Sequence, residues 1–296
     1  MEARHLLMLY EKGVRDFSGV DLSGADLKGA TLIGVNLTGA NLRGANLSRA
    51  FLTKSDLSGA QLNWANLSFA KMSDAKLVEA ELTKANFSGA FMVKSKLPGA
   101  KLSGANLSGV NLRRANLWGA NLCGANLQRT NLRDANVCGV NFNWANLSEA
   151  RLVGAKLYGA SLNGVNLSKA LLKGLDLGGV DLEGVNLKQA KLTGANLEGA
   201  NLVAADLSEA QLNGTNLKGA DLTGANLTRA SLEQANLTWT ILRKANLSDT
   251  NLSAARLNGV DVEESQLEHV PAQRAAFRAC TPLVSQESLF ITMLEN

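Results

Sequence analysis

The residues that most often carry out catalysis are few in this chain and far apart. Only two of its 296 residues are histidines, His5 and His269, and they lie near opposite ends of the sequence. A catalytic histidine has to lie within hydrogen-bond reach of a nucleophile. We therefore expect no Ser–His–Asp or Cys–His arrangement and predict that the protein is not an enzyme.

Other patterns that would indicate a chemical site are also missing. Glycines recur five residues apart, as at Gly119 and Gly124, but no GK[ST] follows them, so no phosphate-binding P-loop is expected. The cysteines, Cys123, Cys138 and Cys280, are odd in number and form no CxxC pair. This spacing disfavours a zinc site or a disulfide framework and favours a reducing compartment. We predict no metal, no cofactor and a cytoplasmic location.

Composition narrows the class of protein further. Hydrophobic residues make up 46% of the chain but aromatic residues only 5%, so Ala and Leu must build the interior. There is no run of 18 apolar residues, so no membrane span is predicted. The first residues, MEARHLLMLYEKGVRDF, contain acidic side chains and no small-residue cleavage site, which is not typical of a secretory signal.

A five-residue repeat extends over nearly the whole chain. In ANLSGVNLRRANLWGANLCGAN, for example, Ala, Asn and Leu recur every five residues. Counted from Leu22 to Leu267 there are 50 consecutive pentapeptides, and 44 of them have Leu at the centre. We number the positions one to five so that this Leu is position three. Ala occupies position one in 34 of the 50. Such regularity predicts a repeat architecture.

A period of five does not suit an α-helix, because successive leucines would be about 140° out of phase and would form no stripe. It does suit a short extended segment in which positions one and three point inward and position two points outward. Positions four and five must then turn a corner. A strand of about three residues followed by a corner, repeated many times, winds into a β-solenoid.

The uninterrupted pattern A(N/D)LxG over residues 17–269 resembles the pentapeptide-repeat family. The resemblance implies an all-β, right-handed quadrilateral β-helix with four pentapeptides per coil. Fifty pentapeptides then make about 12.5 coils, with short helical caps. The expected organisation is a capping helix within residues 1–14, the β-helix over 15–269, and a C-terminal cap or tail over 270–296.

Residue preferences support the 20-residue coil independently of the resemblance. We call the sides first to fourth, starting from the pentapeptides centred on Leu22, Leu27, Leu32 and Leu37. Gly fills position five in 10 of 12 pentapeptides on the fourth side but in 3 of 13 on the second. Asn fills position two in 10 of 13 on the second side and in 3 of 12 on the third. We expect positive-φ turns on the fourth side and stacked Asn amides on the second.

The two ends of a solenoid need caps, because they expose strand edges. Residues 3–11 place apolar side chains at helical spacing and predict an amphipathic helix over the first coil. Residues 281–295 predict a second helix, with Thr281 as N-cap and Pro282 at its first position, or with a later start at Ser285. End-to-end dimerisation through this apolar segment is the alternative to a monomer.

The third side is the candidate partner-binding surface, since it alone carries a strong charge, with nine basic and three acidic residues. Large apolar residues stand among the cations, a mixture typical of binding surfaces. The candidate residues are Phe51, Lys71, Phe91, Lys94, Arg113, Arg114, Arg133, Arg151, Leu171 and Lys173. The alternative is a solvated side whose residues vary without function.

A second candidate patch is position four of the fourth side. Five consecutive coils place Val78, Pro98, Trp118, Cys138 and Tyr158 there, beside glycines that would leave the aromatic rings standing above the surface. The alternative, which we favour, is a ladder of side chains that only stabilises the coils.

The leading functional hypothesis is a non-enzymatic interaction scaffold that binds a protein partner with an acidic or mixed surface and has no small-molecule substrate. The opening LLMLYEKGVRDF resembles cyanobacterial members of the family, some of which act in regulation. The resemblance also offers an alternative, a mimic of B-form DNA that inhibits a type II topoisomerase. Such mimics are strongly acidic, whereas this chain has a net charge of +4 and a pI near 9.0. Weak nucleic-acid binding through the basic side is a third possibility.

Overall fold

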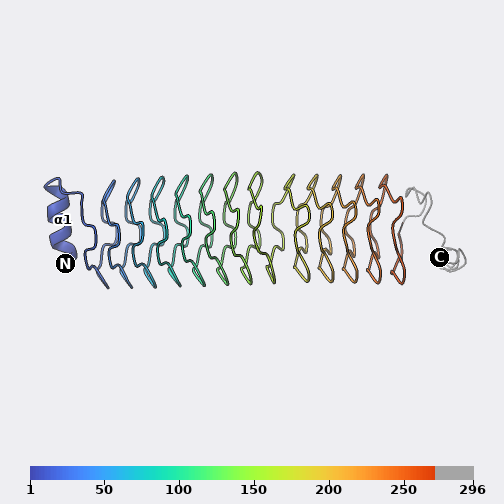
Figure 1. Cartoon of the computed structure of the whole chain (residues 1–296), viewed down its shortest axis with the longest axis horizontal. Coiled ribbons are helices and arrows are strands. Elements are labelled where there is room, and N and C mark those ends of the chain that lie inside the picture. The colour runs from blue at the N-terminus through green and yellow to red at the C-terminus, as the bar shows by residue number, and fades with distance from the viewer. Residues whose placement is uncertain (271–296) are drawn as a thin grey trace, which may run out of the picture. The chain divides into compact units, whose positions relative to one another are not determined.

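A computed structural model describes residues 1–270 of the chain (Figure 1). It divides into two compact units, Met1–Ser161 and Leu162–Asn296. The single helix of the described residues, α1, spans Ala3–Glu11 and so lies within the segment 1–14 for which a helix is expected. The expected C-terminal helix over 281–295, and almost all of the proposed cap or tail, lie outside the described residues.

Each pentapeptide contributes one residue to a parallel β-bridge, and that residue is position two. In the first unit the bridges pair residues 20 apart in sequence, from Asp16 with Asn36 to Asn141 with Ser161. In the second unit they run from Asn166 with Asn186 to Asn246 with Gln266. Within each unit, four pentapeptides therefore complete one coil. The bridges are isolated, so the extended part of a pentapeptide is shorter than the three-residue strand predicted from the repeat.

The corner between two extended parts is a β-turn in every pentapeptide. The backbone N–H of the following position one donates to the carbonyl of position three, as from Ala25 to Leu22 at 3.1 Å. Position five has positive φ at every turn from Gly19 to His269, whether it is Gly or not. The prediction that such turns belong to the fourth side was therefore wrong. Lys, Arg and Trp adopt φ near +60° on other sides, because the stacked coils hold the turn in place.

Leucine and alanine form the interior of both units, as the repeat predicts. From Leu22 to Leu257, the residues at position three are buried. The largest side chains without solvent exposure are Phe87 and Phe142, which replace Leu at position three in the first unit. Ala at position one leaves room for these side chains, so each coil has a narrow apolar core.

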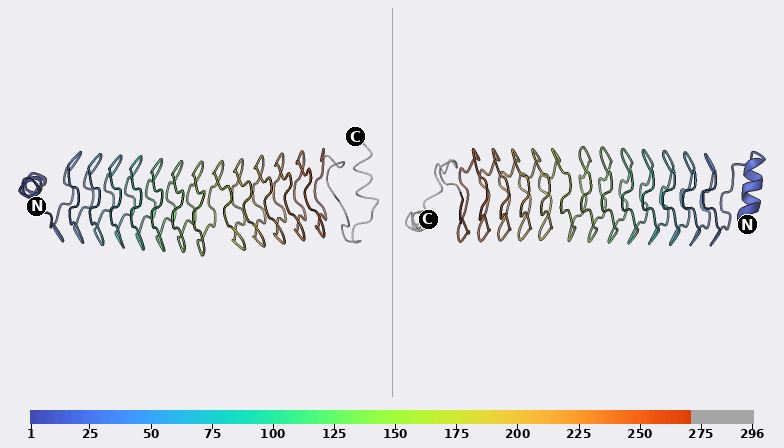
Figure 2. Two further views of the ribbon diagram at one scale, coloured as in Figure 1. Left: turned by 90° about the horizontal axis from the view of Figure 1, so that it is seen from above. Right: turned by 180° about the vertical axis from the view of Figure 1, so that it is seen from behind.

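Helix α1 closes the first coil of the first unit (Figure 2). Leu6 on its inner face has no solvent exposure. The Tyr10 hydroxyl donates to the backbone carbonyl of Ile33 at 2.9 Å, and the Arg15 guanidinium lies 3.8 Å from the centre of the Tyr10 ring. The helix thus covers an edge that would otherwise be open to pairing. Within residues 1–270, no helix has the length and hydropathy needed to cross a membrane.

Candidate protein-binding surface

In the first unit, position two of the third side forms a row in which aromatic rings alternate with a cation. Phe51, Lys71 and Phe91 are bridge partners in successive coils, which lie about 4.8 Å apart. Both rings remain exposed, at 43% for Phe51 and 42% for Phe91. The Lys71 ammonium lies 3.6 Å from the centre of the Phe91 ring. A cation held over a ring in this way still presents both groups to a partner.

The next coils of the same side carry arginines in place of the rings. Arg113 and Arg133 occupy position four of two successive coils, and Arg151 follows at position two of the third. All three are exposed. Together with the preceding row they form what we call the basic–aromatic surface, which consists of Phe51, Lys71, Phe91, Lys94, Arg113, Arg114, Arg133 and Arg151.

Cations of the third side form fewer ion pairs than those of the other sides: within the described residues one of nine is paired there, against eight of sixteen on the other three sides. Among the described residues, only one ion pair involves the third side, a 3.9 Å contact between Arg114 and Asp134. Asp74 stands between Lys54 and Lys94 at position five, yet it forms no ion pair with either among residues 1–270. The remaining cations of the surface are likewise unpaired within the described part of the chain.

Elsewhere, ion pairs join successive coils. Lys76 contacts Asp56 at 3.0 Å, Lys101 contacts Glu81 at 2.6 Å, and both pairs lie outside the third side. Other such pairs are Arg129–Glu149, Lys218–Glu198, Arg229–Asp249, Arg243–Asp261 and Lys244–Glu264. Half of the cations on the other three sides are therefore paired with a carboxylate, whereas eight of the nine cations on the third side have no ion pair within residues 1–270.

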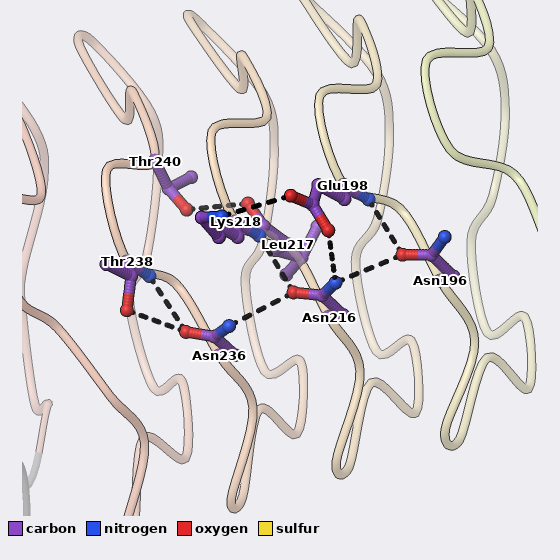
Figure 3. A network of polar contacts seen from close by, with 8 residues as sticks. All are labelled: Asn196, Glu198, Asn216, Leu217, Lys218, Asn236, Thr238 and Thr240. Carbon is purple, nitrogen blue, oxygen red and sulfur yellow. Dashed lines mark hydrogen bonds and ion pairs between the residues drawn. The ribbon is translucent and has the colours of Figure 1, made fainter.

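Two of these paired carboxylates, Asp56 and Glu198, have a lowered pKa. Partial burial alone would raise the pKa of Asp56, but hydrogen bonds from Ser58 and the Lys76 ammonium outweigh it and lower that pKa. Hydrogen bonds from Lys218 and Asn216 lower the pKa of Glu198 (Figure 3). These shifts hold both carboxylates in their charged form and belong to structural pairs.

Two of the ten candidate residues are not brought to this surface. Leu171 and Lys173 lie on the third side of the second unit, which is described separately from the first. Seven of the nine basic residues on the third side belong to the first unit, with two of the three acidic ones. The strong positive charge is thus a property of the first unit.

The second candidate patch is a continuous row in which only the aromatic members project. Trp118 is 60% exposed and Tyr158 is 91% exposed, whereas the three other side chains are half-buried. The backbone holds the row in register, since Gly119 N–H donates to the Cys138 carbonyl at 3.0 Å and Gly139 N–H donates to that of Tyr158 at 2.9 Å. The Cys138 thiol is 3.6 Å from the Lys156 carbonyl. This geometry is compatible with both interpretations of the row.

Sequence reasoning missed two aromatic residues at position five. The ring of Phe69 lies over the backbone of Gly89 in the next coil, so close that a Cβ added at Gly89 would overlap it. Trp64 receives the Lys84 ammonium at 4.5 Å from its ring centre. The signal was present in the sequence as an aromatic residue followed 20 residues later by Gly or Lys. Phe69 precedes Lys71 by two residues and thus adds a ring at the border of the basic–aromatic surface.

The described residues contain no group of three or more His, Cys, Asp or Glu arranged to hold a metal ion. The Nδ1 atom of His269 lies 3.6 Å from the Asp249 carboxylate. Cys123 and Cys138 are free thiols, each partly exposed.

Comparison with known proteins agrees with the repeat. The family model described as pentapeptide repeats matches overlapping segments between residues 21 and 281. No curated protein matches the chain. Among solved structures, HetL from the cyanobacterium Nostoc, described as a pentapeptide repeat protein involved in heterocyst differentiation regulation, is 30% identical. The alignment covers 92% of this chain and 98% of HetL, with a TM-score of 0.33.

Two further solved structures are similar over different lengths. A pentapeptide repeat protein from the Arabidopsis thaliana thylakoid lumen is 31% identical, with 32% of this chain and 66% of that chain covered and a TM-score of 0.32. A plasmid-mediated fluoroquinolone resistance protein is 16% identical, with 93% and 95% covered and a TM-score of 0.23. The match to the family model over most of the length, together with the identity to HetL, shows that the chain belongs to the pentapeptide repeat family of right-handed β-helical proteins.

Proposed function

We propose that this protein is a non-enzymatic interaction scaffold that recruits an acidic protein through the basic–aromatic surface of its first unit. The observation that carries the proposal is the set of unpaired, exposed cations on the third side. On the other sides, half of the cations pair with carboxylates of the neighbouring coil. Exposed cations beside aromatic rings are suited to attract a carboxylate-bearing partner and to anchor it.

The comparison with HetL supports a regulatory setting for such a scaffold, because HetL is described as involved in the regulation of heterocyst differentiation. The repeat provides a rigid backbone on which exterior residues can vary. A cytoplasmic location is part of the proposal and rests on the free, non-clustered cysteines.

Charge reversal tests the proposal. Arg113, Arg114, Arg133 and Arg151 are replaced by Glu in the tagged full-length protein, and partners are captured from a lysate of the native host. We expect the reversed variant to lose the main partners of the wild type, because repulsion replaces attraction across the interface. The proposal is wrong if every partner is retained.

A matched control changes the same number of charges on other sides. Lys28, Arg43, Lys96 and Lys169 are exposed, and none of them forms an ion pair among the described residues. Their replacement by Glu alters the net charge by the same amount. We expect this control to capture the same partners as the wild type, which would assign the effect to the third side.

The topoisomerase-inhibiting DNA mimic remains the alternative, and the charge distribution disfavours it. Mimicry of a DNA backbone requires a dense negative surface. The most strongly charged side of this protein is positive instead. We expect that micromolar protein does not inhibit DNA supercoiling by gyrase. Inhibition in this assay would support the DNA-mimic alternative.

A further inference from the structure

Asn or Asp at the second position of a pentapeptide supplies an acceptor for a backbone N–H at the corner. In every described pentapeptide with Asn or Asp at position two, its side-chain oxygen accepts the backbone N–H of position four. Figure 3 shows this bond from Thr238 to Asn236. The acceptor is an outward side chain, so the N–H faces the exterior of the coil.

The third side departs from this rule over four consecutive coils of the first unit. Position two is there Thr31, Phe51, Lys71 and Phe91: the Phe and Lys side chains have no acceptor oxygen, and the Thr31 hydroxyl makes no bond to the N–H of Ile33. As a result, the backbone N–H groups of Ile33, Thr53, Ser73 and Val93 have no hydrogen-bond partner among the described residues. No other side of the first unit has such a run.

In the two coils that follow on the same side, Asn returns at position two. Arg113 N–H donates to the Asn111 side chain and Arg133 N–H to that of Asn131, each at 3.2 Å. On this side of the first unit, the N–H groups without a partner among residues 1–270 thus form one run of four in the coils that contain the aromatic rings, and the N–H of Val153, which follows Arg151, is a separate one.

The open donors form a row with a spacing of one coil, about 4.8 Å. Lys54, Lys71 and Lys94 belong to the same coils and supply positive charge beside them. The whole row measures about 14 Å, which an extended segment of about five residues would span. Backbone N–H groups next to cations are strong donors to carboxylates.

Other sides of the same protein show which chemical group can accept the backbone N–H of position four. On other sides, aspartate carboxylates occupy the acceptor place, as when Asp56 accepts the N–H of Ser58 at 3.0 Å. A carboxylate brought by another chain could make the same bond on the third side. The second unit has a comparable run of unpaired N–H groups at Lys173, Thr193, Asn213 and Glu233. That run has two lysines and one acidic residue, Glu233, whereas the run of the first unit has three lysines and one acidic residue, Asp74. Charge complementarity therefore favours the first unit.

We infer that an acidic peptide segment of the partner docks along residues 31–94, with its Asp or Glu carboxylates accepting the backbone N–H groups of Ile33, Thr53, Ser73 and Val93. The partner thus supplies the oxygens that Asn and Asp supply elsewhere in the repeat. Phe51 and Phe91 flank the track and contact the apolar parts of the segment. This inference rests on the proposed function and specifies the partner group that the surface recognises.

Two triple variants isolate the backbone donors from the charge and the rings. F51N/K71N/F91N supplies internal acceptors for Thr53, Ser73 and Val93, whereas F51Q/K71Q/F91Q does not. Gln is too long for this bond, since Gln61 and Gln211 leave the N–H groups of Asn63 and Asn213 without that bond in the native protein. Both variants lose the same charge and the same rings. Asn is native at position two of neighbouring coils, so the Asn variant is expected to fold.

The probe is a deca-glutamate peptide, with a glycine–serine peptide of equal length as its uncharged control. Binding to the full-length protein is followed by the amide resonances of Thr53, Ser73 and Val93. We expect these amide protons to move downfield in the wild type and in the Gln variant. In the Asn variant they should not respond, and the dissociation constant should be at least about fivefold weaker than in the Gln variant, as expected for the loss of hydrogen bonds to charged groups.

Three results would overturn the inference. The peptide could bind with shifts confined to Arg113, Arg133 and Arg151, or with equal affinity for the Asn and Gln variants, or not at all. If the same amide resonances shift more with a 12-base-pair DNA duplex than with the peptide, the ligand of this surface is nucleic acid and not an acidic peptide. Each of these outcomes leaves the scaffold proposal to be decided by the charge-reversal capture, which depends on the arginines and not on the N–H row.

Discussion

At the scale of single residues, the same pentapeptide position sets both the local hydrogen bonding and the surface chemistry. Asn at position two closes the corner and stacks on its copy in the next coil, as Asn106 donates to Asn86 at 3.2 Å and Asn86 to Asn66 at 3.4 Å. Replacing Asn by Phe or Lys gives up these bonds and exposes a ring or a charge. The departures from the repeat are therefore the positions at which function is expected.

Glycine substitutions test how Phe69 is held. Gly89 and Gly109 both occupy position five of the second side with positive φ, but only at Gly89 would a Cβ meet the Phe69 ring. We expect Gly109→Ala to cost about 1 kcal/mol in free energy of unfolding, from the left-handed backbone alone. Gly89→Ala should cost more and displace the ring.

Chemical denaturation of the two variants measures the difference between them. The double variant with Phe69→Ala serves as the control, because without the ring the two alanine substitutions should have equal cost. Equal costs already in the single variants would contradict the contact between Phe69 and Gly89.

At the scale of the coil, ion pairs and the apolar core join neighbouring pentapeptides. The pair between Lys76 and Asp56 links successive coils of the fourth side at 3.0 Å. The lowered pKa of Asp56 means that the folded state binds its proton less readily than the unfolded chain. Its stabilising contribution is therefore complete above the unfolded pKa of about 3.9 and is lost as the pH falls through the lower folded pKa.

The Asp56→Asn variant tests this pH dependence. Asn keeps the acceptor for the Ser58 N–H but removes the charge. We expect the wild type to be more stable than the variant by up to about 1 kcal/mol at pH 6, since exposed pairs contribute little. The difference should decrease as the pH falls through the lowered folded pKa of Asp56, because protonation removes the charge that Asn lacks. A difference that is independent of pH, measured by urea unfolding, would contradict this role of the charge.

The core of the first unit depends on a few large side chains. Phe87 fills position three and has no solvent exposure. Phe87→Ala should destabilise the protein by about 3–5 kcal/mol, because it removes apolar contacts and leaves a cavity. The exposed Phe51 provides the control, since Phe51→Ala should change stability by no more than about 0.5 kcal/mol. Thermal unfolding followed by circular dichroism compares the two variants, and similar effects would contradict the burial pattern.

At the scale of the whole molecule, charge is unevenly distributed between the units. The third side of the first unit carries seven basic and two acidic residues, whereas in the second unit it carries Lys173, Lys191 and Glu233. Seven basic minus two acidic residues give the third side of the first unit a charge of +5, which exceeds the +4 of the whole chain. A partner guided by charge should recognise the first unit.

Ionic strength should modulate this recognition. Salt shortens the Debye length from about 10 Å at 0.1 M to about 3 Å at 1 M. We expect binding of the deca-glutamate peptide to weaken several-fold between 50 and 300 mM NaCl, measured by fluorescence anisotropy. The double variant K173E/K191E should keep wild-type affinity and salt dependence. A strong effect of these two substitutions would move the binding site to the second unit.

The sequence by itself determined the repeat, the 20-residue coil, the leucine–alanine interior and the N-terminal helix. These features follow from a strict spacing, because the inward-facing residues must recur at a fixed interval for the core to be continuous. That interval can be read directly from the order of residues in the sequence. The membership of the pentapeptide repeat family follows from the same spacing. The sequence also located the basic third side, because charge can be counted by side once the coil length is known.

Only the tertiary structure decided which of these charges have partners and which backbone donors are open. Lys54 and Arg229 each have an Asp 20 residues further along the sequence, yet Arg229 pairs with Asp249 at 3.6 Å while Lys54 forms no ion pair with Asp74 among residues 1–270. Likewise, the positive φ of every corner came from stacking and not from glycine alone. Hydrogen bonds and ion pairs depend on the distances between atoms of neighbouring coils. The five-residue repeat in the sequence tells which residues are neighbours in successive coils, but it does not give those distances.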